Sequence, residues 1–267
     1  MDILGKIVAH KRLEVDAQKG LQPIERLQEA AFKSGRTPLS LRQALFHGSG
    51  IIAEFKRKSP SRGWIQEDAD PMRVIPEYCA GGASALSILT DSEYFGGKLD
   101  YIKAVRPLVG IPILRKDFII DPFQLYEARL AGADAVLLIA ACLQKDECGA
   151  LCDEAHRIGL EVLLEIHSES ELDYVTVGAD CIGVNNRNLG SFTTDVQNSF
   201  RLIGMLHDKV ASCNASCRPA LVSESGISSP ESLKLLRSAG FNGFLLGEAF
   251  MKQASPGQAL KDFIKEI

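Results

Sequence analysis

Eight short apolar runs alternate along the chain with segments of helical spacing, and this alternation restricts the possible folds more than any other feature. The runs are rich in Ile, Val and Leu with little polar alternation, which is typical of parallel strands covered on both faces. They fall at Gly50–Phe55, Ala85–Leu89, Pro112–Leu114, Ala135–Ile139, Glu161–Ile166, Cys181–Val184, Ala220–Ser223 and Gly243–Leu246. Successive runs lie roughly 20 to 40 residues apart, enough for one crossover helix each.

The segments between the runs carry helix start and stop signals. Asp121–Ala131 begins with Asp and Pro and is followed by Gly132, and Ser229–Ala239 repeats the pattern before Gly240. A helix end, a glycine, a short turn and an apolar run recur together at 79–89, 131–138, 177–184 and 239–246. This recurrence indicates a repeated βα unit. Eight units without a dinucleotide-binding glycine pattern favour an α/β fold of the (β/α)8 TIM-barrel type over a doubly wound sheet.

The first 48 of the 267 residues stand apart from these units. Apolar residues at helical spacing predict three helices there, around Ile3, Leu4, Ile7 and Val8, around Leu21, Ile24 and Leu27, and over Leu39–Phe46. No Gly- or Ser-rich tether follows them. We therefore expect a single domain over residues 1–267, with residues 1–48 as a helical extension packed on a barrel of residues 49–267.

Composition excludes several classes of protein. Hydrophobic residues make up 46% of the chain and charged residues 24%, unlike a disordered chain, a coiled coil or a collagen-like fibre. The net charge of −4 comes without the clustered basic face that nucleic-acid binding requires, so we expect no nucleic-acid partner. No apolar stretch reaches the roughly 20 residues of a membrane-spanning helix, so we expect no membrane partner either.

Seven cysteines are scattered along the chain with no secretory segment before them, which indicates reduced thiols and a cytoplasmic location. Cys213 and Cys217 have the spacing of half a metal site, but no second pair accompanies them, so no metal is expected. The sequence also lacks a dinucleotide-binding motif and a hydrolase order of Ser, His and Asp. We accordingly expect no cofactor.

Polar residues at the carboxyl ends of the apolar runs are the most informative, because the active site of such barrels lies there. Charged, amide, hydroxyl and glycine residues follow these runs at Glu54, Lys56, Ser59, Lys116, Glu165, Asn185, Arg187, Glu224, Ser225, Gly226, Gly247 and Glu248. Unpaired charges at the ends of buried strands are costly. The set therefore predicts an active or binding site at the end of the barrel where the strands have their carboxyl ends. We call this end the mouth.

Each member taken alone also has a plain structural interpretation. The possibilities are an internal ion pair for Glu54 and Lys56, a surface position for Lys116, a structural bridge for Glu165, loop shaping for Asn185 and Arg187, and a helix cap for Ser225 and Gly226. Phe55 and Phe118 fit either an apolar wall of the site or plain core. His167 is the one histidine near the mouth, and we expect it to be structural or solvated. The combination is harder to explain structurally than any single member.

The pattern suits a small phosphorylated substrate. Barrels often hold phosphate on the loops after strands seven and eight, through backbone N–H groups and a short helix. Ser225 with Gly226 and Gly247 with Glu248 occupy those loops, and Lys56 and Ser59 are expected to assist. A buried lysine beside a carboxylate has a shifted pKa, as acid–base pairs require.

Several long motifs resemble those of the indole-3-glycerol phosphate synthase family, in the family's order and over nearly the whole chain. They are ILGKIVAHKRLEV, IIAEFKRKSPSRGWI, SILTDSEYFGG, PILRKDFIIDPFQLYEARLAGADAVLLI, IGVNNRNLGSFTTD and VSESGI. The resemblance implies a metal- and cofactor-free carbon–carbon lyase of tryptophan biosynthesis. Its substrate would be 1-(2-carboxyphenylamino)-1-deoxy-D-ribulose 5-phosphate, converted to indole-3-glycerol phosphate by ring closure, decarboxylation and dehydration.

The resemblance also implies roles for individual residues. Lys116 matches the general acid that protonates the ketone oxygen, Glu165 the paired general base, and Lys56 a second lysine with a later proton-donor role. Orienting residues are matched by Glu54, Asn185, Glu224 and Ser225, a substrate-anchoring arginine by Arg187, and the substrate and phosphate loops by Ser59, Gly226, Gly247 and Glu248. The resemblance leaves open an association with other tryptophan-pathway enzymes.

Two alternatives stay open from the sequence. One is another phosphate-binding barrel of the pathway, such as phosphoribosylanthranilate isomerase or the tryptophan synthase α chain, and the other is a degenerate barrel without catalysis. An isomerase of that family would centre on a Cys and Asp pair, whereas Glu54, Lys116 and Glu165 occupy this mouth. The long, cysteine-rich segment HDKVASCNASCR at 207–218 departs from the family pattern and leaves its loop geometry undetermined.

Overall fold

The computed structural model describes residues 3–188, 190, 193–213 and 218–267. Eight parallel strands pair in the order β1-β10-β9-β8-β7-β6-β5-β4 and close into a barrel, which confirms the predicted TIM-barrel fold. The strands are β1 (Ile51–Phe55), β4 (Ala85–Leu89), β5 (Ile113–Lys116), β6 (Ala135–Ile139), β7 (Glu161–Ile166), β8 (Cys181–Asn185), β9 (Ala220–Glu224) and β10 (Gly243–Leu246). Every apolar run identified in the sequence is one of these strands.

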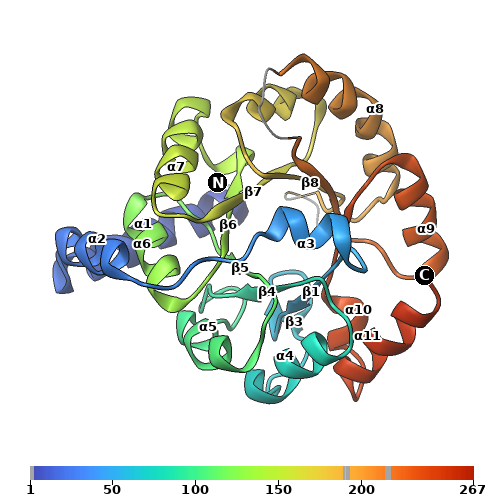
Figure 1. Cartoon of the computed structure of the whole chain (residues 1–267), viewed down its shortest axis with the longest axis horizontal. Helices are drawn as coiled ribbons and strands as arrows, with labels where there is room; N and C mark the ends of the chain where they lie inside the picture. Colours follow the sequence, from blue (N-terminus) through green and yellow to red (C-terminus); the bar gives the residue numbers. More distant parts are fainter. Residues whose placement is uncertain (1–2, 189, 191–192, 214–217) are drawn as a thin grey trace.

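A ring of helices surrounds the barrel (Figure 1). These are α4 (Pro71–Ala80), α5 (Leu99–Val105), α6 (Pro122–Ala131), α7 (Lys145–Arg157), α8 (Gln197–Ser212), α9 (Pro230–Ala239), α10 (Glu248–Met251) and α11 (Pro256–Lys265), with 3₁₀ segments η1 (Arg106–Leu108), η2 (Ala140–Cys142) and η3 (Glu169–Val177). Between β7 and β8 the crossover is η3 rather than an α-helix. A 3₁₀ segment rises more per residue than an α-helix, so it suits this short connection.

The helix boundaries expected from the sequence are made by side-chain caps and glycines. Asp121 accepts a hydrogen bond from the Phe123 backbone N–H at 2.9 Å, and it caps α6. Ser229 caps α9 in the same manner. Each helix ends at a glycine with a positive φ, +98° at Gly132 and +115° at Gly240, a conformation that favours glycine.

The extension consists of α1 (Ile3–Leu21), α2 (Ile24–Lys33) and α3 (Leu41–His47), and it runs from one end of the barrel to the other. In Figure 1, α2 projects beyond the ring of helices, and α3 crosses the middle of the barrel. Leu21, expected in the second helix, instead ends α1 and is 87% exposed, because Pro23 starts the next helix. Leu41 and Leu45 of α3 are buried against the barrel interior, next to Cys181, Ala220 and Val222.

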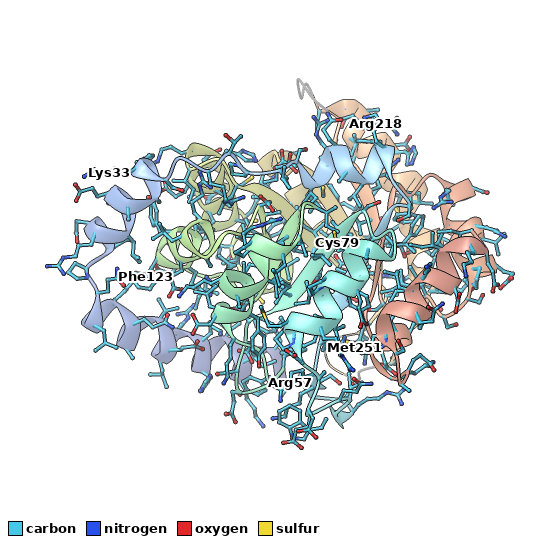
Figure 2. All side chains as sticks on the ribbon, turned by 60° about the horizontal axis from the view of Figure 1, so that its bottom comes forward. Lys33, Arg57, Cys79, Phe123, Arg218 and Met251 are labelled. Carbon is cyan, nitrogen blue, oxygen red and sulfur yellow. The ribbon has the colours of Figure 1, made fainter. Side chains whose placement is uncertain are left out.

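The two ends of the barrel therefore differ. Figure 2 shows the barrel from the side, with Arg57 in the loop after β1 at one end and Arg218 before β9 at the other. Helix α3 closes the Arg218 end. The loop after β1 carries a small hairpin of β2 (Lys58–Ser59) and β3 (Gly63–Trp64), which the sequence did not predict. The open end is the one that the carboxyl ends of the strands face.

Three further findings concern the described residues. None of the helices seen there has the length and apolar character needed to cross a bilayer. Within the same residues, no group of three or more His, Cys, Asp and Glu side chains is arranged to hold a metal ion. Cys213 follows α8 with a free thiol, whereas Cys217 lies outside the described residues.

Candidate active site

Several of the candidate residues stand on the strands themselves rather than in the loops after them. Lys116 is the last residue of β5, Asn185 of β8 and Glu224 of β9, so these strands are longer than the sequence indicated. Asn185 and Glu224 are direct neighbours in the β8–β9 register. Side chains on paired strands are held more firmly than side chains on loops.

At the centre of the site, one lysine lies between two carboxylates. The Lys116 ammonium donates to Glu165 Oε2 at 3.0 Å and to Glu224 Oε2 at 2.5 Å. The Glu165 and Glu224 side chains are buried, and the Lys116 side chain is 13% exposed. The strands that carry them, β5, β7 and β9, are separated around the barrel, so the three groups meet across its interior.

Charge and burial shift the pKa of each group in this cluster. Burial disfavours the Lys116 ammonium, but Glu165 and Glu224 outweigh burial and raise the pKa of Lys116 above its usual value. Burial likewise opposes ionised Glu165, yet Lys116 and then His167 hold the pKa of Glu165 below its usual value. For Glu224, burial dominates and raises the pKa to about 7. The cluster thus contains a persistent ammonium, a persistent carboxylate and a carboxyl group that titrates near neutrality.

A second acid–base pair lies on β1 and the residue after it. Lys56 Nζ is 2.6 Å from Glu54 Oε1, which is the internal ion pair anticipated as one interpretation of these residues. Gly247 faces this pair, and a Cβ there would come within 2.5 Å of Glu54 Oε1. Because Gly247 has no side chain, the Glu54 carboxylate fits beside it without a steric clash.

Gly183 likewise leaves room for the Glu224 carboxylate, and it was not among the site residues predicted from the sequence. A Cβ on Gly183 would overlap Glu224 Oε1, which is buried and has no hydrogen-bond partner among the described residues. The available signal was a glycine inside the apolar run 181–184, since glycine within a strand often marks a close approach.

A cavity of about 900 Å³ opens above these groups. One side is polar and is lined by predicted residues, namely Glu54, Lys56, Ser59, Lys116, Glu165, Asn185, Arg187, Glu224 and Ser225. The other side is apolar and includes Ile3, Leu4 and Ile7 of α1 together with Phe95 and Phe118. The rings of Phe95 and Phe118 lie 6.1 Å apart. Phe118 therefore belongs to the wall of the cavity, and the contribution of α1 was not expected from the sequence.

A second cavity, of about 700 Å³, adjoins the first and shares Glu54, Lys56, Arg187 and Ser225 with it. Its remaining lining includes Gly226, Gly247 and Glu248, the residues expected to bind phosphate. Ser225 and Gly226 have φ values of +67° and +76°. A positive φ is costly for serine, and such strain is concentrated at functional sites. All thirteen predicted site residues thus line one of two connected cavities.

Arg187 lies between the two cavities. Its guanidinium donates to Ser61 Oγ at 3.0 Å and lies 3.6 Å from Glu248 Oε2. Glu248 also pairs with Arg62 at 3.0 Å. Glu248 therefore holds two arginines in the lining of the second cavity.

His167, expected to be structural or solvated, lies directly behind Glu165. Its Nε2 is 3.3 Å from Glu165 Oε1, and its side chain is only 13% exposed. The signal in the sequence was strand parity: Glu161, Leu163, Glu165 and His167 alternate with residues of the other face, so His167 continues the inward row of Glu165.

Comparisons with known proteins complete the description. A sequence model of the family described as indole-3-glycerol phosphate synthase matches residues 4–263. A protein of that name from Bacteroides thetaiotaomicron is 56% identical over 266 residues, covering 100% of this chain and 99% of its own. Another of that name from Carboxydothermus hydrogenoformans is 43% identical and covers 97% of this chain and 98% of its own.

Among solved structures, thiamine phosphate pyrophosphorylase from Pyrococcus furiosus superposes with a TM-score of 0.60. The superposition covers 85% of this chain and 97% of that chain, at 15% sequence identity. At this identity the likeness shows the barrel fold alone.

Proposed function

The chain belongs to the indole-3-glycerol phosphate synthase family, and on this premise we propose that Lys116 donates the proton of ring closure and that Glu165 accepts the proton released in dehydration. The protein is a carboxy-lyase of tryptophan biosynthesis. It closes the pyrrole ring of 1-(2-carboxyphenylamino)-1-deoxy-D-ribulose 5-phosphate, releases CO₂ and water, and leaves indole-3-glycerol phosphate. The family match favours this activity over an isomerase-like or degenerate barrel.

Ring closure needs an electrophilic ketone. The ring carbon that bears the carboxylate forms a bond to the ketone carbon, and the electron pair of the C=O double bond moves to the oxygen, which becomes negatively charged. This attack also breaks the aromaticity of the ring, so the ketone must be strongly activated. The Lys116 ammonium, buried between Glu165 and Glu224, donates its proton to that oxygen. Loss of CO₂ then returns the electron pair to the ring and restores aromaticity. The observation that carries this role is the location of one ammonium on the floor of the cavity, held by two carboxylates.

Dehydration needs an acid for the departing hydroxyl and a base for the departing proton. Lys56 serves as the acid, supported by its position on the cavity wall 2.6 Å from Glu54. Glu165 serves as the base, since contact with Lys116 and His167 keeps its carboxylate ionised. Glu54, Glu224, Asn185 and Ser225 orient these groups and the substrate.

The substrate spans both cavities. Its aromatic ring packs on the apolar wall of Phe118, and its phosphate lies in the second cavity beside Gly226 and Gly247. Lys56 and Arg187 line both cavities and contact the part of the substrate that joins its aromatic ring to its phosphate. Ser59 Oγ, buried and without a hydrogen-bond partner among the described residues, donates to the bound substrate. Fixing the ring against the ribulose chain is a proximity effect.

Three further expectations belong to this proposal. The chain acts as one domain, supported by the α1 residues in the cavity wall and the α3 residues in the barrel core. It works in the cytoplasm, supported by seven scattered cysteines, a usage that suits reduced thiols. An association with other tryptophan-pathway enzymes is tested by sedimentation of the protein mixed with each of them.

Replacement of Lys116 tests the assigned role. Lys116→Ala is expected to lower kcat about 10²- to 10⁴-fold in a fluorescence assay for indole-3-glycerol phosphate, since general acids contribute that much. Lys103→Ala, which removes an exposed lysine paired with Asp100, is the matched control and keeps its activity. A folded wild-type protein without turnover would contradict the lyase activity, whereas full turnover by Lys116→Ala contradicts only the role of Lys116.

A further inference from the structure

His167 contacts the proposed base Glu165, but no step of the reaction above is assigned to it. It follows β7 and lies between two carboxylates, with Nε2 3.3 Å from Glu165 Oε1 and Nδ1 3.6 Å from Glu171 Oε2. Glu171, at the start of η3, also accepts a hydrogen bond from the His167 backbone N–H at 2.6 Å. Neither ring nitrogen makes a hydrogen bond to the described residues, so the ring interacts with the two carboxylates electrostatically.

The surroundings of the ring favour its charged form. Burial alone would favour neutral imidazole, but Glu165 and Glu171 outweigh it and raise the pKa of His167 to about 10. From α8, the neutral Asn198 side chain donates to the His167 carbonyl oxygen at 2.9 Å. The remaining charged groups nearby are Lys116, behind Glu165, and Arg187, Asp195 and Arg201, which line a cavity on the outer side of the ring.

Glu165 is therefore flanked by two cations on opposite oxygens. Lys116 binds Oε2 and His167 faces Oε1. The two cations differ in their access to substrate, because Lys116 lines the main cavity and His167 does not. When Lys116 gives its proton to the ketone oxygen, Glu165 loses one of these charges while it remains buried beside Glu224. A buried carboxylate without a counter-charge takes up a proton at neutral pH.

We propose that His167 is a positively charged positioning residue that keeps Glu165 ionised after Lys116 has released its proton. The inference rests on the proposed roles of Lys116 and Glu165. No proton passes through His167 in this scheme, and Glu171 anchors its charge from the far side. Glu165 thereby remains a base for the later dehydration step, at the point of the cycle when its other partner is neutral.

A merely structural bridge from β7 to η3 would have the same contacts, and the pH profile separates the two interpretations. Loss of an opposite charge at this distance raises a carboxylate pKa, so the acid limb of kcat in His167→Gln is expected to move upward by about one pH unit or more. KM is expected to change little, because His167 does not line the substrate cavity. His167→Lys, which keeps a positive charge, is expected to return the limb toward its wild-type position.

His156→Gln is the matched control. It removes another histidine–carboxylate contact, 2.8 Å from Asp180, on α7 and away from both cavities. Its pH profile is expected to match that of the wild type. A uniform loss of kcat at every pH in His167→Gln, with the acid limb unmoved, would overturn the proposal.

A measurement on the wild-type protein makes the test independent of the variants. ¹⁵N chemical shifts of the His167 ring are expected to show imidazolium at pH 8, above the ordinary histidine range. A neutral ring at that pH overturns the proposal. This measurement requires no turnover. It can therefore contradict the proposed role of His167 without affecting that of Lys116, and the Lys116→Ala assay can do the reverse.

Discussion

Two buried lysines, Lys11 in α1 and Lys116 in β5, resemble each other until their surroundings are compared. Lys11 lies 3.0 Å from both Asp91 and Asp117 and 2.8 Å from Glu14. Lys116 lies within 3.0 Å of Glu165 and Glu224. In both cases burial opposes the ammonium, the carboxylates outweigh burial, and the pKa of the lysine is raised. A shifted pKa therefore does not distinguish the two.

The two clusters differ in how they lie relative to the main cavity. Asp117 also pairs with Arg115 at 3.0 Å and accepts hydrogen bonds from Thr90 and the Phe118 backbone N–H. Asp91 Oδ2 beside Lys11 and Glu224 Oε1 beside Lys116 are both buried and have no hydrogen-bond partner among the described residues, so incomplete hydrogen bonding does not distinguish the two clusters. Lys11 itself does not line the main cavity, although its partner Asp117 does, whereas Lys116 lines the cavity directly. Contact of the ammonium with a cavity is thus a better sign of chemistry than burial with ion pairing.

The largest expected difference concerns stability. Lys11→Met leaves the buried Asp91 without its opposite charge, while Asp117 keeps Arg115, so it is expected to lower the free energy of unfolding by about 3 to 5 kcal/mol. Activity per folded molecule is expected to change little, because Lys11 does not line the cavity. Urea unfolding followed by fluorescence measures the loss. Lys6→Met, at an exposed lysine of the same helix, is the control and should unfold as the wild type does. An equal free energy of unfolding for Lys11→Met and Lys6→Met would show that the ion pairs of Lys11 do not stabilise the fold.

A smaller effect tests the space reserved for Glu224. In Gly183→Ala the new methyl group displaces the Glu224 carboxylate from Lys116, and kcat is expected to fall about 100-fold, as for other small misplacements of catalytic groups. Adding Glu224→Asp, which shortens the side chain, is expected to recover part of the loss. Gly149→Ala places the same methyl where nothing lies within 4 Å, and its kcat should stay at the wild-type value. Unchanged kcat in Gly183→Ala would show that Glu224 tolerates displacement.

The smallest effect is a pH dependence of opposite sign in the two clusters. The pKa of Glu224 is raised from 4.5 to about 7 in the folded state, so its contribution to stability is present below pH 4.5 and lost as the pH rises through 7. Burial would raise the pKa of Asp117 too, but Arg115 and Lys11 hold it at about 2. The contribution of Asp117 is accordingly present above pH 3.8 and lost as the pH falls toward 2.

Urea unfolding of the wild type and of Glu224→Gln between pH 4.5 and 7.5 measures the first of these trends. The stability of the wild type relative to the variant is expected to fall by about 3 kcal/mol over this range, since one pKa unit corresponds to about 1.4 kcal/mol. Parallel pH curves for the two proteins would contradict the assigned titration of Glu224.

Much of the fold was predictable because its signals are local. Alternation of apolar runs with capped helices specifies strands and helices one at a time, and Asp121 and Ser229 cap α6 and α9 as expected. The mouth was predictable for a related reason: parallel strands all end on the same side of the barrel. The strand ends were misplaced by one or two residues, because Lys116, Asn185 and Glu224 are polar and resemble loop residues in a local pattern.

The sequence by itself thus determined the barrel, its helical extension and the set of residues at its mouth, since periodicity, capping and repeats act over short stretches of chain. Only the tertiary structure decided which charges meet. Lys116 and Glu224 are 108 positions apart, yet their side chains are in contact across the barrel. The enclosure of Lys11, the space above Gly183 and the contact of His167 with Glu165 likewise depend on distances and burial in the folded chain, which local patterns do not encode.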